Sequence, residues 1–318
     1  MSKRKQDITV LFVAGEGRSG STLLGRTLGQ VPGAIMCGEI VSLWNAKWRR
    51  RAGFRNLCEC STPPQTCDFW ETVLKDSGLD EATLGEINTR TQPVFRNSSI
   101  AALKEIIFPG SIRVDEQPEA MFVKLYEVLS EHTGAVLIVD TSKNPAMAFW
   151  LSHLKGIDLR VVHLIRDSRG VAFSWTKKVA LPDAGGRPVT MRRFRPLKSV
   201  LRWDLTNIVI PQLRKRGCPV LRVRYEDLIE RPRHCVERIL QFSGIDAQGE
   251  ELSFLRDDAV YLRPGHSLAG NPNRRQSGWI SFRKDNAWRS RMPVRYRIGA
   301  TILSLPLLMC HGYLAKQR

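Results

Sequence analysis

Short apolar runs of strand length recur along the chain and alternate with longer segments of helical periodicity. The runs that predict strands are residues 8–13, 34–37, 135–139, 159–165 and 220–224. Segments of helical pattern between them include residues 118–132, 145–154 and 197–215. Strands that are nearly continuous in Val, Ile and Leu are typical of parallel sheets buried on both faces. The pattern therefore predicts an α/β fold with a central parallel β-sheet flanked by helices on both faces.

The first predicted strand runs directly into a glycine-rich turn and a segment of helical pattern, residues 23–29. The turn holds three glycines, Gly15, Gly17 and Gly20, and the hydroxyl residues Ser21 and Thr22 follow them. Glycines let the backbone approach an anion closely, and free N–H groups at a helix start point toward it. The spacing nearly matches the phosphate-binding pattern G-x-x-x-x-G-K-[ST]. Ser21 replaces the lysine of that pattern, and Arg18 is the cation inside the loop.

Three later strands are also followed by residues suited to an anion site. Arg166 follows one strand, and Ser174 lies two turns along the helix that we expect to begin near Asp167. An arginine and a hydroxyl placed in this way can bind one phosphate together; the alternative is a helix cap at Asp167 with solvated arginines. Lys143, a further cation, follows another strand, and Tyr225 follows a third, where the alternative is that it only packs. Because ligands bind at the carboxyl ends of strands in open α/β sheets, we expect these residues to share one edge.

The charge of the chain supports an anionic ligand. Its 318 residues carry 49 Lys and Arg against 31 Asp and Glu, a formal net charge of +18. Such an excess favours nucleotides, sulfated or acidic substrates, nucleic acid or anionic membranes, and does not choose among them. The basic tracts lack regular aromatic interleaving, so we expect no nucleic-acid partner. We expect one domain over residues 8–314, with an inserted cysteine-containing loop at about 47–70 and a C-terminal helix at about 293–314.

The apolar stretch at residues 298–314 is too short and too interrupted for a membrane span of about 20 residues. We expect a buried C-terminal helix there, with weak contact to a membrane surface as the alternative. The first apolar run is interpreted as a strand and not as a signal peptide, which predicts a cytoplasmic location. Residues 47–67, 181–196 and 263–279 are expected to be loops that line the site, and their flanking residues favour no β-hairpin.

Seven scattered cysteines indicate a reducing compartment and mostly free thiols. Cys58, Cys60 and Cys67 form the exception, because they lie close together in the sequence. They are candidate ligands of a structural zinc ion, with Cys37 as a candidate fourth ligand. The alternatives are packed thiols or a local disulfide, and the C-x-C spacing differs from the usual C-x2-C zinc knuckle.

From residue 8 to about 290, these segments together resemble the sulfotransferase family that uses 3′-phosphoadenosine 5′-phosphosulfate (PAPS). The stretch 17–24 resembles the family's loop for the 5′-phosphosulfate, and the stretch 166–174 resembles its 3′-phosphate motif, in the same order. Residues 224–227 resemble a segment whose tyrosine contacts the nucleotide, and residues 270–275 resemble a late loop that closes over PAPS. The resemblance implies these nucleotide-binding residues: Gly17, Arg18, Ser19, Gly20, Ser21, Thr22, Arg166, Ser174, Tyr225, Arg274 and Arg275.

The same resemblance implies three catalytic residues: Arg18, Lys143 and Glu39. Lys143 resembles the active-site lysine of the tyrosylprotein branch, and Glu39 lies in the segment that carries that branch's acidic residue. Ile40 stands where that branch has a second Glu as its base, so the alternative for Glu39 is a cap or ion pair for the following helix. His266 and His163 are further candidates for the base. We expect His163 to be a core residue and His266 to shape the nucleotide pocket.

The implied activity is transfer of a sulfuryl group from PAPS to an acceptor hydroxyl, with 3′,5′-ADP as product and no metal required. The first-loop arginine and the Trp288-Arg289 ending look closer to the carbohydrate branches, which favours a carbohydrate or glycolipid acceptor. The alternatives are a small-molecule kinase that uses Mg-ATP and a non-catalytic basic module that binds anions. The sequence leaves the oligomeric state open.

Overall fold

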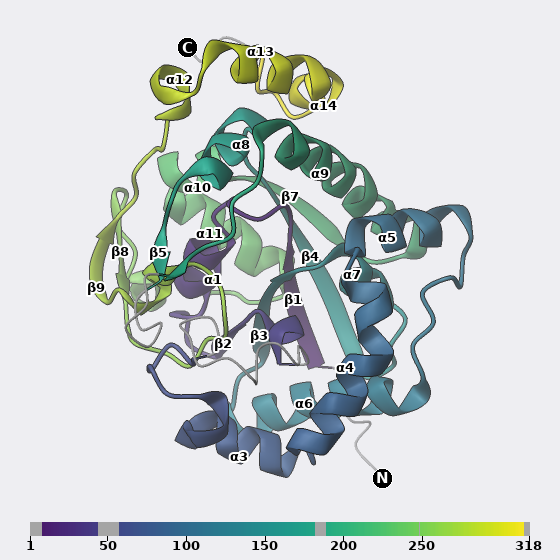
Figure 1. Cartoon of the computed structure of the whole chain (residues 1–318). Coiled ribbons are helices and arrows are strands. Elements are labelled where there is room, and N and C mark those ends of the chain that lie inside the picture. Colours follow the sequence, from purple (N-terminus) through teal and green to yellow (C-terminus); the bar gives the residue numbers. More distant parts are fainter. Residues whose placement is uncertain (1–7, 44–56, 182–188, 248, 315–318) are drawn as a thin grey trace.

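A computed structural model describes residues 8–43, 57–181, 189–247 and 249–314. Five parallel strands form its central sheet in the order β2-β3-β1-β4-β7 (Figure 1). They are β1 (Ile8–Ala14), β2 (Ala34–Gly38), β3 (Leu137–Lys143), β4 (Ile157–Ile165) and β7 (Val220–Arg224). Each coincides with or overlaps an apolar run that predicts a strand, so the predicted α/β fold with a parallel sheet is confirmed.

Alternate residues of β1 point to opposite faces of the sheet and enter two different cores. Val10 and Phe12 pack in one core, whereas Leu11 and Val13 pack in the other. The first core is covered by α3 (Asp68–Asp76), α4 (Glu81–Phe95), α5 (Ser98–Ile107), α6 (Glu116–Thr133) and α7 (Pro145–Leu151). The second is covered by α1 (Ser21–Leu28), α10 (Tyr225–Glu230) and α11 (Pro232–Phe242).

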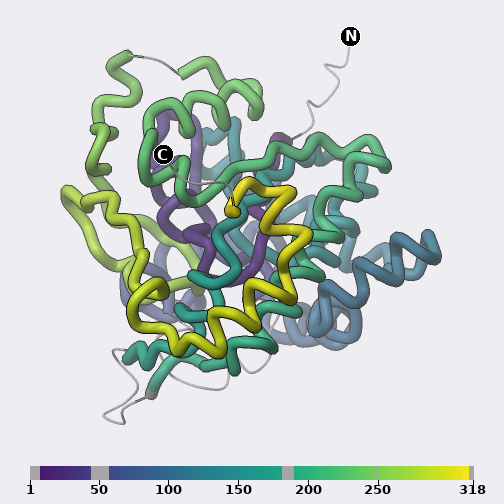
Figure 2. The backbone as a smooth tube through the Cα atoms, turned by 90° about the horizontal axis from the view of Figure 1, so that it is seen from above, coloured from purple at the N-terminus to yellow at the C-terminus, as the bar shows by residue number. Residues whose placement is uncertain are grey.

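The C-terminal part of the chain lies over two helices that border the sheet. These two helices are α8 (Ser168–Thr176) and α9 (Pro196–Val209), and α9 continues into the 3₁₀ segment η4 (Ile210–Arg216). Above them lie α12 (Trp288–Arg291), α13 (Val294–Leu303) and α14 (Leu305–Cys310) (Figures 1 and 2). The single C-terminal helix expected at 293–314 is therefore wrong. The helix is interrupted at Ser304 because Pro306 lacks the N–H that a continuous helix needs.

Two β-hairpins contradict the expectation that the long loops carry none. The strands β5 (Ala180–Leu181) and β6 (Val189–Thr190) pair antiparallel, as do β8 (Ala259–Leu262) and β9 (Gly278–Ser281). Both pairs consist of very short strands whose connections are longer than a two-residue turn, so no local turn signal marks them. The connection between β8 and β9 includes the 3₁₀ segment η6 (Pro272–Arg275).

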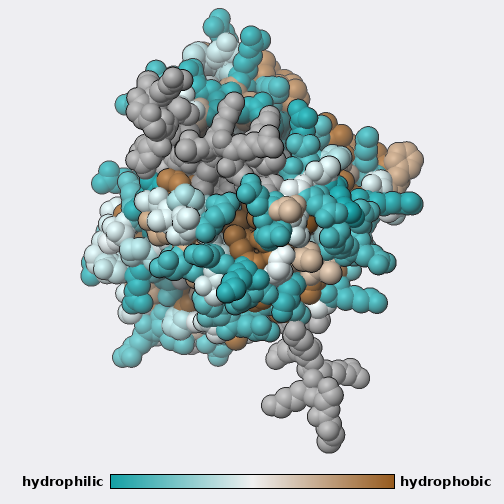
Figure 3. All heavy atoms as spheres, turned by 60° about the horizontal axis from the view of Figure 1, so that its bottom comes forward, coloured by the Kyte–Doolittle hydropathy of each residue, from teal (hydrophilic) through white to brown (hydrophobic). Residues whose placement is uncertain are grey.

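Among the described residues, the exterior on the side of α3 and α6 shows no continuous apolar face (Figure 3). Figure 3 views this side, and the side chains in view are mainly hydrophilic, with hydrophobic ones in small separate patches. Within the described ranges, every helix is too short or too polar to span a bilayer. Short 3₁₀ segments complete the fold: η1 (Ile40–Ser42), η3 (Pro64–Thr66) and η5 (Gly249–Leu252). The basic residues at 47–56 of the expected inserted loop lie outside the described residues.

Candidate active site

The carboxyl ends of four strands bring the sequence-predicted residues to one edge of the sheet. The glycine loop follows β1, Lys143 ends β3, Arg166 follows β4 and Tyr225 follows β7. The strand β1 lies between β3 and β4, so connections leave the sheet in opposite directions beside it. Connections that diverge in this way leave a crevice at the carboxyl ends of the strands, and open α/β sheets bind their ligands there.

The glycine loop approaches its neighbours too closely for larger residues. A Cβ atom at Gly17 would lie 2.6 Å from Cζ2 of Trp175, and one at Gly20 would lie 2.6 Å from Cδ2 of Tyr225. Gly20 also has a φ of 93° and precedes α1, so the N–H groups of that helix face the loop. The hydroxyl of Ser19 is buried without a hydrogen-bond partner among the described residues. A buried hydroxyl beside free N–H groups suits an oxyanion.

Arg18 has an irregular backbone conformation, and its side chain contacts Trp175 of α8. Its φ is 73°, in the left-handed region. Its guanidinium carbon lies 5.1 Å from the ring centroid of Trp175, and its Nη2 lies 3.2 Å from Sδ of Met191. Its carbonyl oxygen accepts a hydrogen bond from Nη1 of Arg166 at 3.0 Å. The loop and the Arg166 segment, which are distant in sequence, are thus joined directly.

Arg166 is held on several sides at the end of β4. Its side chain is 8% exposed and forms an ion pair with Asp285 at 3.2 Å. Its guanidinium carbon lies 4.6 Å from the ring centroid of Tyr225, in a cation–π contact. Asp285 also pairs with Lys177 at 2.9 Å, so one carboxylate is shared by two cations and offsets only part of their charge. Sequence reasoning missed Asp285, because no local motif marks it.

The helix α8 packs beside Arg166 and carries Ser174. The carboxylate of Asp167 accepts a hydrogen bond from the backbone N–H of Arg169 at 2.9 Å, so the alternative of a capping role is also realised. A Cβ atom at Gly170 would lie 3.4 Å from Nε of Arg166. Ser174 is four residues beyond Gly170 and therefore lies on the same helix face.

Lys143 and Glu39 form an ion pair above the ends of β2 and β3. The distance from Nζ to Oε1 is 2.5 Å, and the side chains are 17% and 23% exposed. Lys143 has a φ of 61°, and the pairing of β1 with β3 shifts register beside it, which turns its side chain out of the sheet. Glu39 makes no side-chain cap to the following η1 segment. The expected alternative, a cap or ion pair for that segment, is therefore replaced by an ion pair with the predicted active-site lysine.

A buried carboxylate lies directly beneath this pair. Oδ1 of Asp140 accepts hydrogen bonds from the backbone and the hydroxyl of Ser142, and Oδ2 accepts one from Tyr126 at 2.8 Å. Burial raises the pKa of Asp140 to about 6, against the opposing effect of these hydrogen bonds. Asp140 therefore fixes the backbone that presents Lys143.

The loop at residues 263–276, here called the 263–276 loop, crosses the same edge. The backbone N–H of Glu39 donates to the carbonyl of Leu268 at 2.8 Å, and the N–H of Asn271 donates to Oγ1 of Thr22 at 3.3 Å. Arg274 is fully buried, and its Nη2 donates to the carbonyl of Leu57 at 2.7 Å. Burial lowers the pKa of Arg274 to about 10. Arg275 lies beside it at the end of η6.

The two histidines proposed as further bases lie elsewhere. His163 is buried, and its Nε2 lies 2.8 Å from Oδ1 of Asn207, as expected for a core residue. His266 was expected to shape the nucleotide pocket, but its Nδ1 lies 3.3 Å from Sγ of Cys67. Cys37, the candidate fourth zinc ligand, is buried on β2 and does not join that cysteine cluster. Only the fold reveals the position of His266, because it is far from the cysteines in sequence.

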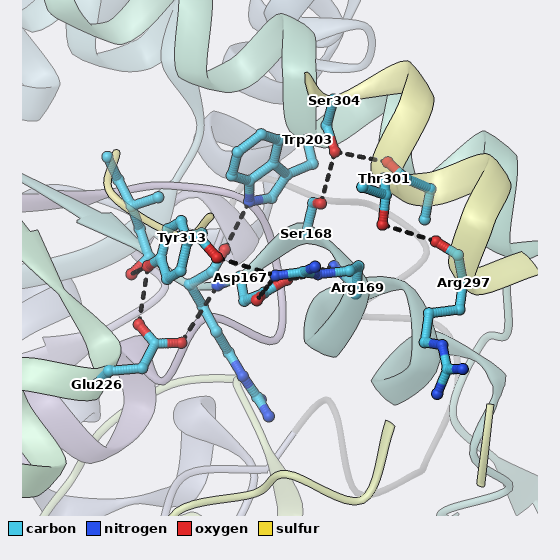
Figure 4. Close-up of polar contacts among 12 residues, drawn as sticks. Asp167, Ser168, Arg169, Trp203, Glu226, Arg297, Thr301, Ser304 and Tyr313 are labelled. Carbon is cyan, nitrogen blue, oxygen red and sulfur yellow. Dashed lines mark hydrogen bonds and ion pairs between the residues drawn. The ribbon is translucent and has the colours of Figure 1, made fainter. Parts of the chain in front are cut away.

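The C-terminal segment, residues 294–313, supports the Arg166 side of the site, and no motif in the sequence indicates this. The hydroxyl of Tyr313 donates to Oε2 of Glu226 at 2.8 Å and lies 3.2 Å from the carbonyl of Ile165 (Figure 4). The hydroxyls of Ser168 and Ser304 are 2.7 Å apart. These contacts hold the residues on either side of Arg166.

Comparisons with known proteins show the family of this chain. Residues 11–249 match the model of the sulfotransferase family, and no curated protein matches the chain. The sulfotransferase domain from the curacin biosynthetic pathway aligns with a TM-score of 0.53 and 16% identity, covering 96% of this chain and 98% of that one. The sulfotransferase domain of the Synechococcus PCC 7002 olefin synthase aligns with a TM-score of 0.49 and 19% identity, covering 96% of each chain.

A third structure, sulfotransferase STF9 from Mycobacterium avium, aligns with a TM-score of 0.41 and 14% identity, covering 79% of this chain and 67% of that one. At such identities, the likeness to the curacin domain shows the fold alone. The family match extends over most of the chain and includes the glycine loop, Lys143 and the Arg166 segment. The chain therefore belongs to the sulfotransferase family and is a sulfotransferase enzyme.

Proposed function

We propose that this sulfotransferase transfers the sulfuryl group of PAPS to a hydroxyl of a carbohydrate or glycolipid. One observation carries the proposal: Nη1 of Arg166 donates to the carbonyl of Arg18, so the loop for one phosphate adjoins the cation for another. PAPS carries two separate anionic groups, a 5′-phosphosulfate and a 3′-phosphate. A pair of adjoining anion sites is what such a donor requires.

The residues present fit the donor. The buried, unpartnered hydroxyl of Ser19 and the N–H groups at the start of α1 suit the 5′-phosphosulfate. Arg166 and Ser174 would hold the 3′-phosphate, with Tyr225 beneath the guanidinium. Arg274 and Arg275 would approach from the 263–276 loop. Asp285, which neutralises Arg166 in the structure, would share that arginine with the incoming phosphate.

The residues of this chain would mainly position the reactants and stabilise charge. When bound, the donor supplies the sulfuryl group and a phosphate leaving group. Like phosphoryl transfer, this reaction needs in-line geometry and little covalent work from the protein. Arg18, Lys143 and the loop N–H groups would stabilise the negative charge that develops on the leaving phosphate. These groups supply positive charge without a metal ion.

Glu39 is the proposed general base. A carboxylate that accepts the proton of the acceptor hydroxyl has to lie at the site and be accessible. Glu39 is partly exposed and pairs with Lys143 at 2.5 Å, so base and charge-stabilising lysine lie side by side. The backbone N–H of Glu39 donates a hydrogen bond to the carbonyl of Leu268, which fixes the backbone from which the carboxylate extends.

Direct binding and transfer assays test the function. We expect the protein to bind 3′,5′-ADP in calorimetry and to transfer a labelled sulfuryl group from PAPS to members of a panel of glycans and glycolipids. Arg166→Ala should weaken 3′,5′-ADP binding. Arg113→Ala is the matched control, because Arg113 is exposed in the connection between α5 and α6.

Two results would overturn the proposal. An absence of 3′,5′-ADP binding contradicts the donor, and a preference for Mg-ATP over PAPS favours the small-molecule kinase. Transfer to peptide tyrosine or small metabolites, without transfer to any glycan or glycolipid, contradicts only the acceptor. The non-catalytic alternative requires anion binding without any transfer.

A further inference from the structure

Three cysteines and one histidine converge at the surface beside the 263–276 loop. The ligand atoms of Cys58, Cys60, Cys67 and His266 all lie within 4.8 Å of one another. Sγ of Cys60 and Sγ of Cys67 are 3.5 Å apart. Nδ1 of His266 lies 3.6 Å from Sγ of Cys58 and 3.3 Å from Sγ of Cys67. Nδ1 of His266 thus faces the sulfurs of two cysteines at once.

These separations match the edges of a tetrahedron around zinc. With Zn–S bonds of about 2.3 Å and Zn–N bonds of about 2.0 Å, two sulfurs lie about 3.8 Å apart and a sulfur and a nitrogen about 3.5 Å apart. The observed distances between Cys60 and Cys67 and between His266 and its two sulfurs are within a few tenths of an ångström of these values. Three sulfurs and one imidazole nitrogen form one of the usual donor sets of structural zinc.

The protein around the cluster fixes the ligands before any metal arrives. The imidazole of His266 stacks on the ring of Phe69, with centroids 4.8 Å apart and planes 14° apart. Nε1 of Trp70 donates to the carbonyl of His266 at 2.5 Å. Ser61 has a φ of 80° and turns the chain between Cys60 and Thr62, whose hydroxyl lies 3.0 Å from Sγ of Cys60. Outer contacts of this kind orient ligands in metal sites.

We propose that Cys58, Cys60, Cys67 and His266 bind one structural Zn²⁺ that joins the 263–276 loop to the segment at residues 57–67. Four protein ligands complete the tetrahedron and leave no position for a substrate, so the ion would be structural and not catalytic. Binding forms three Zn–S bonds and one Zn–N bond and releases the three thiol protons to solvent. The inference does not depend on which donor or acceptor the enzyme uses.

Because of the position of the cluster, a bound ion would affect the candidate active site. Two residues after His266, Leu268 bonds with Cys37 and Glu39 at the end of β2. Leu57, the neighbour of Cys58, accepts the hydrogen bond of the buried Arg274. The metal would therefore fix both ends of the contact between the two segments, and its loss would loosen the loop that carries Arg274 and Arg275.

Metal analysis of the full chain tests the proposal. Protein expressed without added metal and purified under reducing conditions should contain about one zinc per chain by elemental analysis. Cys67→Ser and His266→Ala should lose the metal, whereas Cys310→Ser should retain it, because Cys310 is exposed on α14, outside the cluster. A chelator should lower the melting temperature of the wild type, and zinc should restore it.

Cobalt substitution of the wild type keeps the test decisive if the variants fail to fold. Cobalt in a site with three thiolates should give thiolate-to-metal charge-transfer bands and the ligand-field bands of tetrahedral coordination, and zinc should displace it. Metal-free protein with all thiols titratable would overturn the proposal. A disulfide between Cys60 and Cys67 in place of metal would also overturn it, and metal retained by His266→Ala would overturn the assignment of the fourth ligand.

Discussion

The 263–276 loop and the C-terminal segment both contact the carboxyl edge of the sheet, but they are attached by different chemistry. The loop reaches the edge through Leu268 and Asn271, and its His266 belongs to a cluster with three thiols. The C-terminal segment is attached by buried hydroxyl and carboxyl groups such as those of Tyr313 and Glu226. Thiol clusters respond to metals and oxidants, whereas buried hydrogen bonds do not.

The two sides also contact different candidate residues. The loop bonds to Glu39, which pairs with Lys143, whereas the C-terminal segment contacts residues that flank Arg166. We therefore expect the loop side to govern the transfer step and the C-terminal side to govern nucleotide affinity. Variants on each side test this division.

The largest effect is expected on the loop side. Lys143→Ala should lower kcat about 10²–10³-fold, because it removes a charge that stabilises the leaving phosphate. The affinity for 3′,5′-ADP should fall much less. Steady-state kinetics with PAPS and calorimetry with 3′,5′-ADP measure the two quantities separately. Equal losses in both would refute the division.

The next effect is expected on the other side. Arg166→Ala should weaken 3′,5′-ADP binding about 10- to 100-fold, because it removes charge-assisted hydrogen bonds to a phosphate. Arg113→Ala serves as the control in the same titration. An Arg166 variant with unchanged affinity would show that the 3′-phosphate binds elsewhere.

A smaller effect is expected from the support of Arg166. Tyr313→Phe should lower the free energy of unfolding by about 1–3 kcal/mol, because it leaves Oε2 of the buried Glu226 without its donor. Denaturant unfolding measures the change. Chelator treatment should leave this loss unchanged, because the C-terminal segment is remote from the thiol cluster. If the loss in free energy of unfolding changed with the chelator, the two sides would be coupled and the division would be wrong.

The smallest effect is a pH dependence on the C-terminal side. Burial, with smaller contributions from His311, Arg214 and Arg222, lowers the pKa of His163 from 6.5 to about 3, against the opposing hydrogen bond to Asn207. The stability that the neutral ring provides is complete above pH 6.5 and is lost as the pH falls from there toward 3. Between pH 7 and 5.5 the expected loss is about 1 kcal/mol.

The variant His163→Gln should reduce this slope, since glutamine keeps a donor for Asn207 but does not titrate. Melting temperatures recorded from pH 7 to pH 5.5 compare the two proteins. An identical slope would show that other groups, such as His311, carry the acid sensitivity. Burial, together with the charges of Arg222 and Arg224, lowers the pKa of His311 to about 4.

The sequence predicts the parallel sheet well. Each strand of the sheet is an apolar run, because its side chains enter the cores on both faces of the sheet. It predicts less where contacts depend on distant segments. The strands β8 and β9 are four residues each, and their cross-strand pair of Tyr261 and Trp279 has no local signature. His266 and Asp285 likewise acquire partners only through the fold. The spacing of Cys58, Cys60 and Cys67 indicates a cluster, but the fourth member could not be found from spacing.

The contact between Cys58 and His266 joins residues 208 positions apart. During synthesis, the three cysteines emerge long before the histidine, while the β-strands between them are still incomplete. The cluster therefore closes late, after most of the chain has been made. Its completion would report that the 263–276 loop has docked on the segment at residues 57–67, which makes it a marker for a late step of folding.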